Sequence, residues 1–140
     1  MQKLLEKAIF IAISAHKGQV DKGGNLYILH PLRVMLAMEN VEEQIVAMLH
    51  DVIEDSKITI KELEDNKFPK QILEAVALLT KKNDQPYEDY ILAIKKNSLA
   101  RKVKQADLKD NMNKNRLKKV TEADQLRIIK YKKAYKLLAT

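Results

Sequence analysis

The chain has 140 residues, no cysteine, and a net charge of +7 from 26 Lys and Arg against 19 Asp and Glu. This length fits one domain with a proper hydrophobic core, and the lack of cysteine excludes disulfides and thiolate metal sites. No apolar run is long enough to span a bilayer or to act as a signal peptide, so we expect a cytoplasmic protein without a membrane partner.

The charge is unevenly distributed along the chain. Residues 1–65 carry 7 Lys and Arg against 11 Asp and Glu, whereas residues 66–140 carry 19 against 8. An acidic half next to a basic half suits a metal site flanked by a surface that attracts phosphate. The alternative is an ordinary lysine-rich, solvated surface.

The N-terminal region predicts a helix followed by a loop. Residues 2–17 have apolar side chains at the i, i+3, i+4 spacing of an amphipathic helix, with His16 at the end of its apolar side. All three glycines of the chain fall in the following segment, 18–29, which predicts a loop. Because it carries Lys22 close to His16, this loop could approach a phosphate or be an ordinary connector.

The next two predicted helices are rich in apolar residues. One begins at His30–Pro31, since proline suits the first helical position, and ends at Asn40. The other covers residues 41–54. Its apolar residues, which we expect to face the core, are Ile45, Val46, Met48, Leu49, Val52 and Ile53.

The remaining chain predicts further short helices. Thr59 and Glu62 form a capping-box pattern that opens a helix to about residue 65. Others are expected from Pro69, from Pro86 and over residues 99–111. The last covers 121–138, with Thr121 as N-cap and with the following residues inside: Leu126, Ile129, Ala134, Leu137 and Leu138.

These patterns predict the fold class. No segment alternates with period two, and there are no internal repeats. We therefore expect an all-α protein, a compact single-domain bundle of about seven short helices formed by residues 1–140.

The stretch from His50 to Asp55 carries an imidazole and three carboxylates inside an apolar segment. On one continuous helix, His50 would lie above Glu54 and Asp51 above Asp55, all on one face. Buried carboxylates are costly unless they are paired or bind a metal. The alternative is a chance His-Asp pair followed by a solvated last turn, although acidic residues there oppose the helix dipole.

Matching ligands occur elsewhere in the chain. His16 ends an apolar helix, and Asp107 is a carboxylate on the apolar side of the predicted helix 99–111. Together with His50 and Asp51 they would fill four positions around a divalent ion that accepts His and carboxylate ligands, such as Mn²⁺, Fe²⁺, Mg²⁺ or Zn²⁺. Such an ion lowers the pKa of water, and Glu54 and Asp55 would orient that water or move its proton. This chemistry predicts hydrolysis of phosphate esters.

At this level of detail the chain resembles the HD metal-dependent phosphohydrolases. The resemblance extends to the hydrolase domains of RelA/SpoT proteins and to small stand-alone alarmone hydrolases, and it covers roughly residues 1–115. It is carried by four segments: Ala15-His16-Lys17-Gly18-Gln19, Tyr27-Ile28-Leu29-His30-Pro31, Leu49 to Asp55, and Ala106-Asp107 followed by Asn111-Met112.

The resemblance implies a compact α-helical HD-type fold, Mn²⁺ as the usual cofactor, and removal of the 3′-pyrophosphate from guanosine tetra- or pentaphosphate. Carried over by position, the metal ligands are His16, His50, Asp51 and Asp107. Glu54 and Asp55 match the catalytic acidic pair, and Lys22 and Asn111 match substrate-binding residues. His30 is expected to brace the loop rather than to bind metal.

The chain departs from the family at two positions, because Asp21 and Leu108 stand where basic residues are common. The metal chemistry is unaffected, but other substrates stay open, including the adenosine analogue, NADPH and other small phosphate esters. A non-catalytic module that binds nucleotides or nucleic acid is the further alternative. Lysines spread over several helices and few aromatic residues count against nucleic acid, and the sequence does not indicate an oligomeric state.

Overall fold

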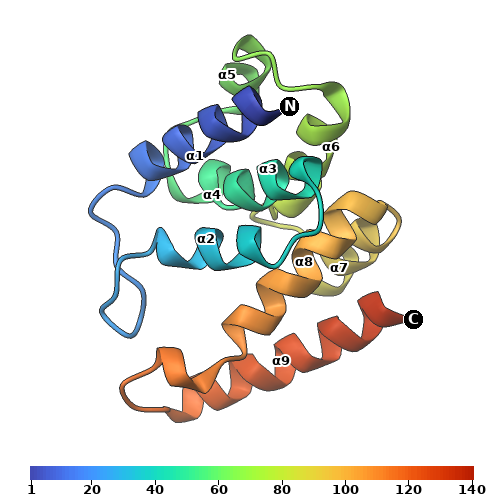
Figure 1. Ribbon diagram of the computed structural model, residues 1–140. Helices are drawn as coiled ribbons and strands as arrows, with labels where there is room; N and C mark the ends of the chain where they lie inside the picture. The colour runs from blue at the N-terminus through green and yellow to red at the C-terminus, as the bar shows by residue number, and fades with distance from the viewer.

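The computed structural model describes residues 1–140 and confirms the all-α class. It contains nine α-helices and one 3₁₀ helix (Figure 1). In chain order these are α1 (Gln2–His16), α2 (Leu29–Leu36), α3 (Val41–Leu49), α4 (Val52–Asp55), α5 (Ile60–Asp65), α6 (Lys70–Leu79), α7 (Tyr87–Lys95), α8 (Ser98–Asn111), η1 (Lys114–Arg116) and α9 (Glu122–Ala139). No helix has the length and apolar character needed to cross a bilayer.

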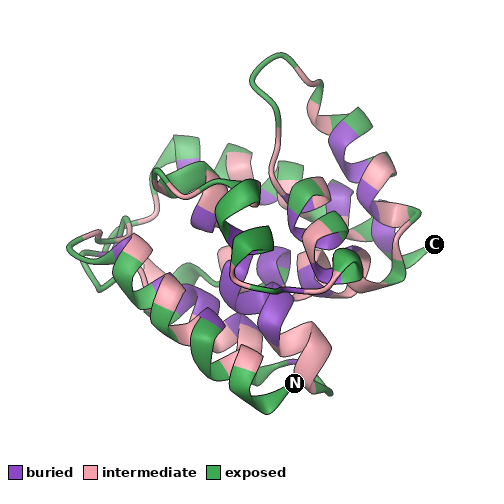
Figure 2. Ribbon diagram, turned by 90° about the horizontal axis from the view of Figure 1, so that it is seen from above, coloured by how far each residue is buried: buried purple, intermediate pink, exposed green.

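Helix α3 lies at the centre of the bundle. It packs against α1, α2, α6 and α8, while α9 packs along α7 and α8 on the other side (Figure 1). Residues 45–49 of α3 are all buried, and they belong to a single core cluster of 24 buried residues. In Figure 2 the buried residues, coloured purple, gather toward the middle of the molecule.

Polar caps fix the start of several helices. Asn40, Thr59, Asn97 and Thr121 each accept a hydrogen bond from a backbone amide three residues further on. The N-caps predicted at Thr59 and Thr121 are therefore confirmed. At Thr121 the bond is reciprocated by Asp124, which completes a capping box.

The helix predicted over residues 41–54 is interrupted. α3 ends at Leu49 and α4 begins at Val52, so His50 and Asp51 form the junction. Asp51 has φ −108° and ψ 0°, outside the values of a regular α-helix. The prediction that His50 lies above Glu54 on one continuous helix is therefore wrong. α2 is also shorter than predicted, because it ends at Leu36 rather than at Asn40.

The predicted inner face of the last helix is wrong in its first half. Leu126 and Ile129 are more than 60% exposed, whereas Ile128, Ala134 and Leu138 are buried. Apolar residues occur at two phases along this segment, so periodicity alone does not select one. The packing of α9 against α7 and α8 selects the phase that contains Ile128.

Candidate metal centre and adjoining pocket

Four side chains from three parts of the chain meet in the interior. His30 comes from the first turn of α2, His50 and Asp51 from the junction after α3, and Asp107 from α8. One potential ligand atom of each lies within 4.8 Å of one from every other. Nε2 of His30 is 2.8 Å from Oδ1 of Asp107, and Nε2 of His50 is 3.0 Å from Oδ2 of Asp51 and 3.2 Å from Oδ1 of Asp107.

Behind the cluster, Nδ1 of each histidine faces a hydrogen-bond acceptor. Nδ1 of His30 lies 2.6 Å from Oδ2 of Asp110, and Nδ1 of His50 lies 2.5 Å from the carbonyl oxygen of Ala47. A carboxylate and a carbonyl only accept hydrogen bonds, so both rings carry a proton on Nδ1. In a neutral ring, Nε2 then presents its lone pair toward the carboxylates of the cluster.

Two hydrogen-bond acceptors at 2.8–3.2 Å repel each other unless a positive charge lies between them. A second proton on each ring would supply that charge. Burial lowers the pKa of His50, but the charges of Asp51 and Asp107 outweigh it and place the pKa well above its usual value. A divalent cation is the other solution, since unprotonated imidazole and carboxylate are its ordinary ligands.

Asp107 is held in place by its own helix. Nζ of Lys104, one turn earlier, is 2.9 Å from Oδ2, and Nδ2 of Asn111, one turn later, donates to Oδ1 at 3.1 Å. Burial alone would raise the pKa of Asp107, but the charges of Lys104 and His50 hold this pKa well below its usual range. Oδ1 therefore faces the cluster as an ionised oxygen.

Asp110 supports His30 from behind. Nε of Arg33 donates to its Oδ1 at 2.9 Å, and Nη1 of Arg116 lies 3.0 Å from its Oδ2. Although burial opposes it, the hydrogen bonds from His30 and Arg33 lower the pKa of Asp110 to about 2. An ionised carboxylate behind a histidine is a recurrent support for metal-binding imidazoles.

The structure brings His30, and not His16, into the cluster. His16 is buried at the end of α1, where its Nδ1 donates to Oε1 of Gln19 at 2.9 Å and its Nε2 has no partner. Gln19 in turn donates to the backbone oxygen of Asp55 at 2.8 Å. Because α2 packs against both α3 and α8, it delivers its histidine to the other three residues, whereas α1 packs on α3 and α4.

The acidic pair lies on α4, directly after the cluster. Glu54 Oε1 accepts the backbone N–H of Lys81 at 2.6 Å, and partial burial raises the pKa of both Glu54 and Asp55. Both side chains border a surface hollow shared with Lys81 and Lys82. They are therefore accessible carboxylates, one short helix away from the buried ones.

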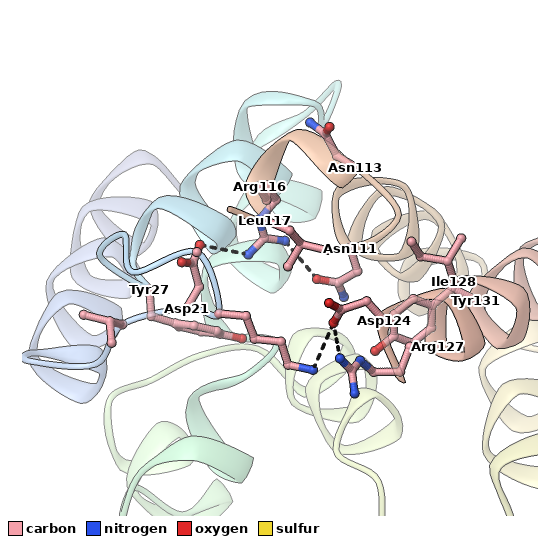
Figure 3. A pocket seen from close by; sticks show the side chains of 13 residues that line it. Asp21, Tyr27, Asn111, Asn113, Arg116, Leu117, Asp124, Arg127, Ile128 and Tyr131 are labelled. Carbon is pink, nitrogen blue, oxygen red and sulfur yellow. Dashed lines mark hydrogen bonds and ion pairs between the residues drawn. The ribbon is translucent and has the colours of Figure 1, made fainter. Parts of the chain in front are cut away.

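The segment between α1 and α2, residues 17–28, contains all three glycines and is called the glycine loop below. A cavity of about 270 Å³ opens between the glycine loop and the start of α9 (Figure 3). It is lined by Val20, Asp21, Lys22, Gly23, Tyr27, Asn111, Asn113, Arg116, Leu117, Asp124, Arg127, Ile128 and Tyr131. Both residues predicted to bind substrate, Lys22 and Asn111, are among them. Tyr27 joins the cavity to the cluster, because its hydroxyl donates to Oδ2 of Asp51 at 2.5 Å.

The glycine loop is docked on η1. A Cβ placed on Gly23 would lie 2.0 Å from the carbonyl oxygen of Arg116, so only glycine fits there. Nη2 of Arg116 lies 3.5 Å from Oδ2 of Asp21, and its Nη1 donates to Oδ1 of Asn111 at 3.0 Å. Arg116 thus links the glycine loop, through Asp21, to α8, through Asn111 and Asp110.

Of the two residues that depart from the family's pattern, Asp21 and Leu108, only Asp21 can affect ligand binding in the cavity. Leu108 is fully buried in the core, so it does not face the cavity. Asp21 lines the cavity, and its carboxylate is engaged by the N–H of Asn25 at 2.9 Å and by Arg116. Sequence patterns did not single out Arg116, Asp124, Arg127 or Tyr131 as site residues. The basic character of the C-terminal half was a hint only for the two arginines.

No family model matches the chain. Over 91 residues it is 34% identical to the bifunctional (p)ppGpp synthase/hydrolase SpoT of Escherichia coli K12. This match covers 62% of this chain and 13% of that protein. Over 120 residues it is 31% identical to a guanosine-3′,5′-bis(diphosphate) 3′-pyrophosphohydrolase of Aquifex aeolicus, covering 77% of this chain and 17% of that protein. The chain thus spans less than a fifth of these relatives' length.

The chain also matches a solved structure described as a metazoan ortholog of SpoT that hydrolyzes ppGpp. The TM-score is 0.77 at 18% identity, over 96% of this chain and 84% of that one. This likeness shows a shared fold. The resemblance to RelA/SpoT-type hydrolases that the motifs predicted is confirmed in sequence by the curated relatives and in fold by this structure.

Proposed function

We propose that the chain is a metal-dependent phosphohydrolase that removes the 3′-pyrophosphate from guanosine 3′,5′-bis(diphosphate). The observation that carries the proposal is the buried cluster, in which Nε2 atoms of two imidazoles face two carboxylates at 2.8–3.2 Å. The curated relatives that carry this activity, and the fold shared with a ppGpp hydrolase, support the substrate class.

In this proposal His30, His50, Asp51 and Asp107 hold the metal. Two neutral nitrogens and two carboxylate oxygens suit Mn²⁺ and other divalent ions of similar hardness. A bound ion supplies Lewis-acid stabilisation and lowers the pKa of water. His16, which the motif had placed among the ligands, instead orders Gln19 and the end of α4.

The protein's own residues supply the remaining chemistry. Glu54 and Asp55 orient the attacking water and receive its proton, a role suited to carboxylates whose pKa is raised. Lys22 and Arg116 attract the phosphates of the nucleotide, and Asn111 binds near its sugar. Tyr27 and Tyr131 offer the cavity aromatic surface for the nucleoside.

Turnover of a substrate panel tests the proposal. The protein is incubated with Mn²⁺ and, separately, guanosine tetraphosphate, its adenosine analogue, NADPH and simple nucleotides, and pyrophosphate and phosphate release are followed by mass spectrometry. We expect pyrophosphate from guanosine tetraphosphate and no turnover after chelation. No turnover of any compound by protein with measured bound metal would contradict the proposal.

A second candidate is hydrolysis of another small phosphate ester at the same centre. Asp21 favours it, because an acid lines the cavity where the family commonly has a base. The panel separates the two candidates by the compound with the highest kcat/KM. The cytoplasm as the compartment stays a prediction from the sequence.

A non-catalytic nucleic-acid module is the remaining alternative. Its test is salt-dependent binding of nucleic acid that survives His50→Ala. Binding of that kind, together with an inactive panel, would replace the enzymatic proposal.

A further inference from the structure

The cations that line the cavity are already paired with carboxylates in or next to the cavity. Arg116 lies beside Asp21 and Asp110. Nζ of Lys22 is 3.9 Å from Oδ1 of Asp124, and Nη2 of Arg127 pairs with the same oxygen. Figure 3 shows the Asp124 carboxylate beside the Arg127 guanidinium, and the Lys22 ammonium lies near the same carboxylate oxygen.

Asp124 is held rigidly. It is the third residue of α9, and its Oδ2 accepts the backbone N–H of Thr121 at 2.9 Å and the Thr121 hydroxyl at 2.8 Å. The hydrogen bond from this backbone amide lowers the pKa of Asp124, so the side chain is a carboxylate near neutral pH. Its side chain is only 8% exposed.

The two cations are more exposed than the anion. The side chain of Lys22 is 58% exposed and that of Arg127 37% exposed, and both are long and rich in rotamers. A phosphate that enters the cavity can therefore draw them away, but Asp124 stays in place. Its negative charge then opposes the phosphate.

We propose that Asp124 is a specificity-determining residue: it acts as the internal counter-anion of Lys22 and Arg127, and it lowers the affinity of the cavity for each phosphate that lies beside these two cations, those of the proposed substrate included. The inference rests on the proposed function only in that the cavity takes a phosphorylated nucleotide. Each added negative charge on the ligand meets more repulsion from Asp124, so the penalty grows from one phosphate to three.

Binding without turnover tests this inference. The affinities of GMP, GDP and GTP are measured by calorimetry with metal chelated, for the full chain and for Asp124→Asn. The amide keeps an oxygen that accepts from Thr121 but removes the charge. We expect GTP affinity to rise about tenfold and GMP affinity to rise less, so that the variant prefers the more charged ligand.

Two variants control for charge and for folding. Glu122→Gln removes the same charge from the exposed first turn of α9, away from the two cations, and should leave all three affinities unchanged. Asp124→Glu keeps the charge at a position where a capping box accepts glutamate, and should show no gain. Circular dichroism and thermal melts establish that each variant is folded.

A gain of affinity does not arise from misfolding, which separates the expected result from simple damage. Unchanged or weaker GTP binding by folded Asp124→Asn would overturn the inference, and so would an equal gain in Glu122→Gln. If neither the parent chain nor Asp124→Asn binds any of the three nucleotides, the inference also fails. Pyrophosphate release from the substrate panel is a separate readout, so the proposed function can stand or fall independently.

Discussion

The buried cluster and the adjoining cavity are built in different ways. His30, His50, Asp51 and Asp107 lie on or between packed helices, and each is fixed from behind by a hydrogen bond or ion pair. The cavity is formed by a glycine loop, η1 and the first turns of α9, and its cations are partly exposed. The cluster is thus preorganised for one chemistry, whereas the cavity can adapt to its ligand.

This contrast predicts that changes in the cluster act on metal binding and kcat, and that changes in the cavity act on KM. The largest expected effect comes from substituting His30, a histidine of the cluster. His30→Gln should lose Mn²⁺ affinity by more than about 100-fold and lose measurable turnover with it, because it removes a ligand atom. His16→Gln is the matched control and should keep the metal.

Metal content by mass spectrometry and Mn²⁺ titration by calorimetry check this pair. Loss of metal in His16→Gln with retention in His30→Gln would restore the ligand set expected from the sequence motif. It would also remove the basis for the cluster described above.

Glu54→Gln should lower kcat by about 10²- to 10⁴-fold, because the amide cannot accept a proton from water. Metal binding should be unchanged, since Glu54 lies outside the cluster. Steady-state kinetics and metal analysis measure the two quantities. Glu64→Gln, an exposed change on α5, serves as the control, and a normal kcat in Glu54→Gln would exclude the proposed role.

Asp110→Asn should weaken Mn²⁺ binding by about 10- to 100-fold, the usual cost of losing the carboxylate behind a metal-binding histidine. His30 itself remains, so the effect is smaller than that of His30→Gln. Calorimetry of the full chain measures the affinity. Asp89→Asn on the exposed face of α7 is the control, and equal affinities in both variants would show that Asp110 does not support His30.

Gly23→Ala should raise KM severalfold and destabilise the protein by about 1–3 kcal/mol, the cost of overpacking. The added Cβ would meet the carbonyl oxygen of Arg116, so the loop must move away from η1. Kinetics and thermal melts check the two effects. Gly18→Ala provides a contrast, because it adds only the strain of φ +82° in open space, and it should leave KM nearly unchanged.

Much of the fold was predictable from local patterns. Helix content, the caps at Thr59 and Thr121, and the starts after Pro69 and Pro86 follow from periodicity and from side chains that bond to nearby amides. The phase of α9 was not predictable, because its apolar residues fit two faces equally well. The break at His50–Asp51 was missed because nothing in the residue types distinguishes it from a continuous helix.

The sequence by itself determined the all-α class, the caps, and the concentration of imidazole and carboxylate that indicates a divalent metal. These depend on residue type and on spacings of a few positions, which a helix converts directly into shared faces. Only the tertiary structure decided that His30 rather than His16 joins His50, Asp51 and Asp107, and that Asp124 lies near both Lys22 and Arg127. Those outcomes depend on which helices pack together, and residues 77 or more positions apart meet only once the core has formed.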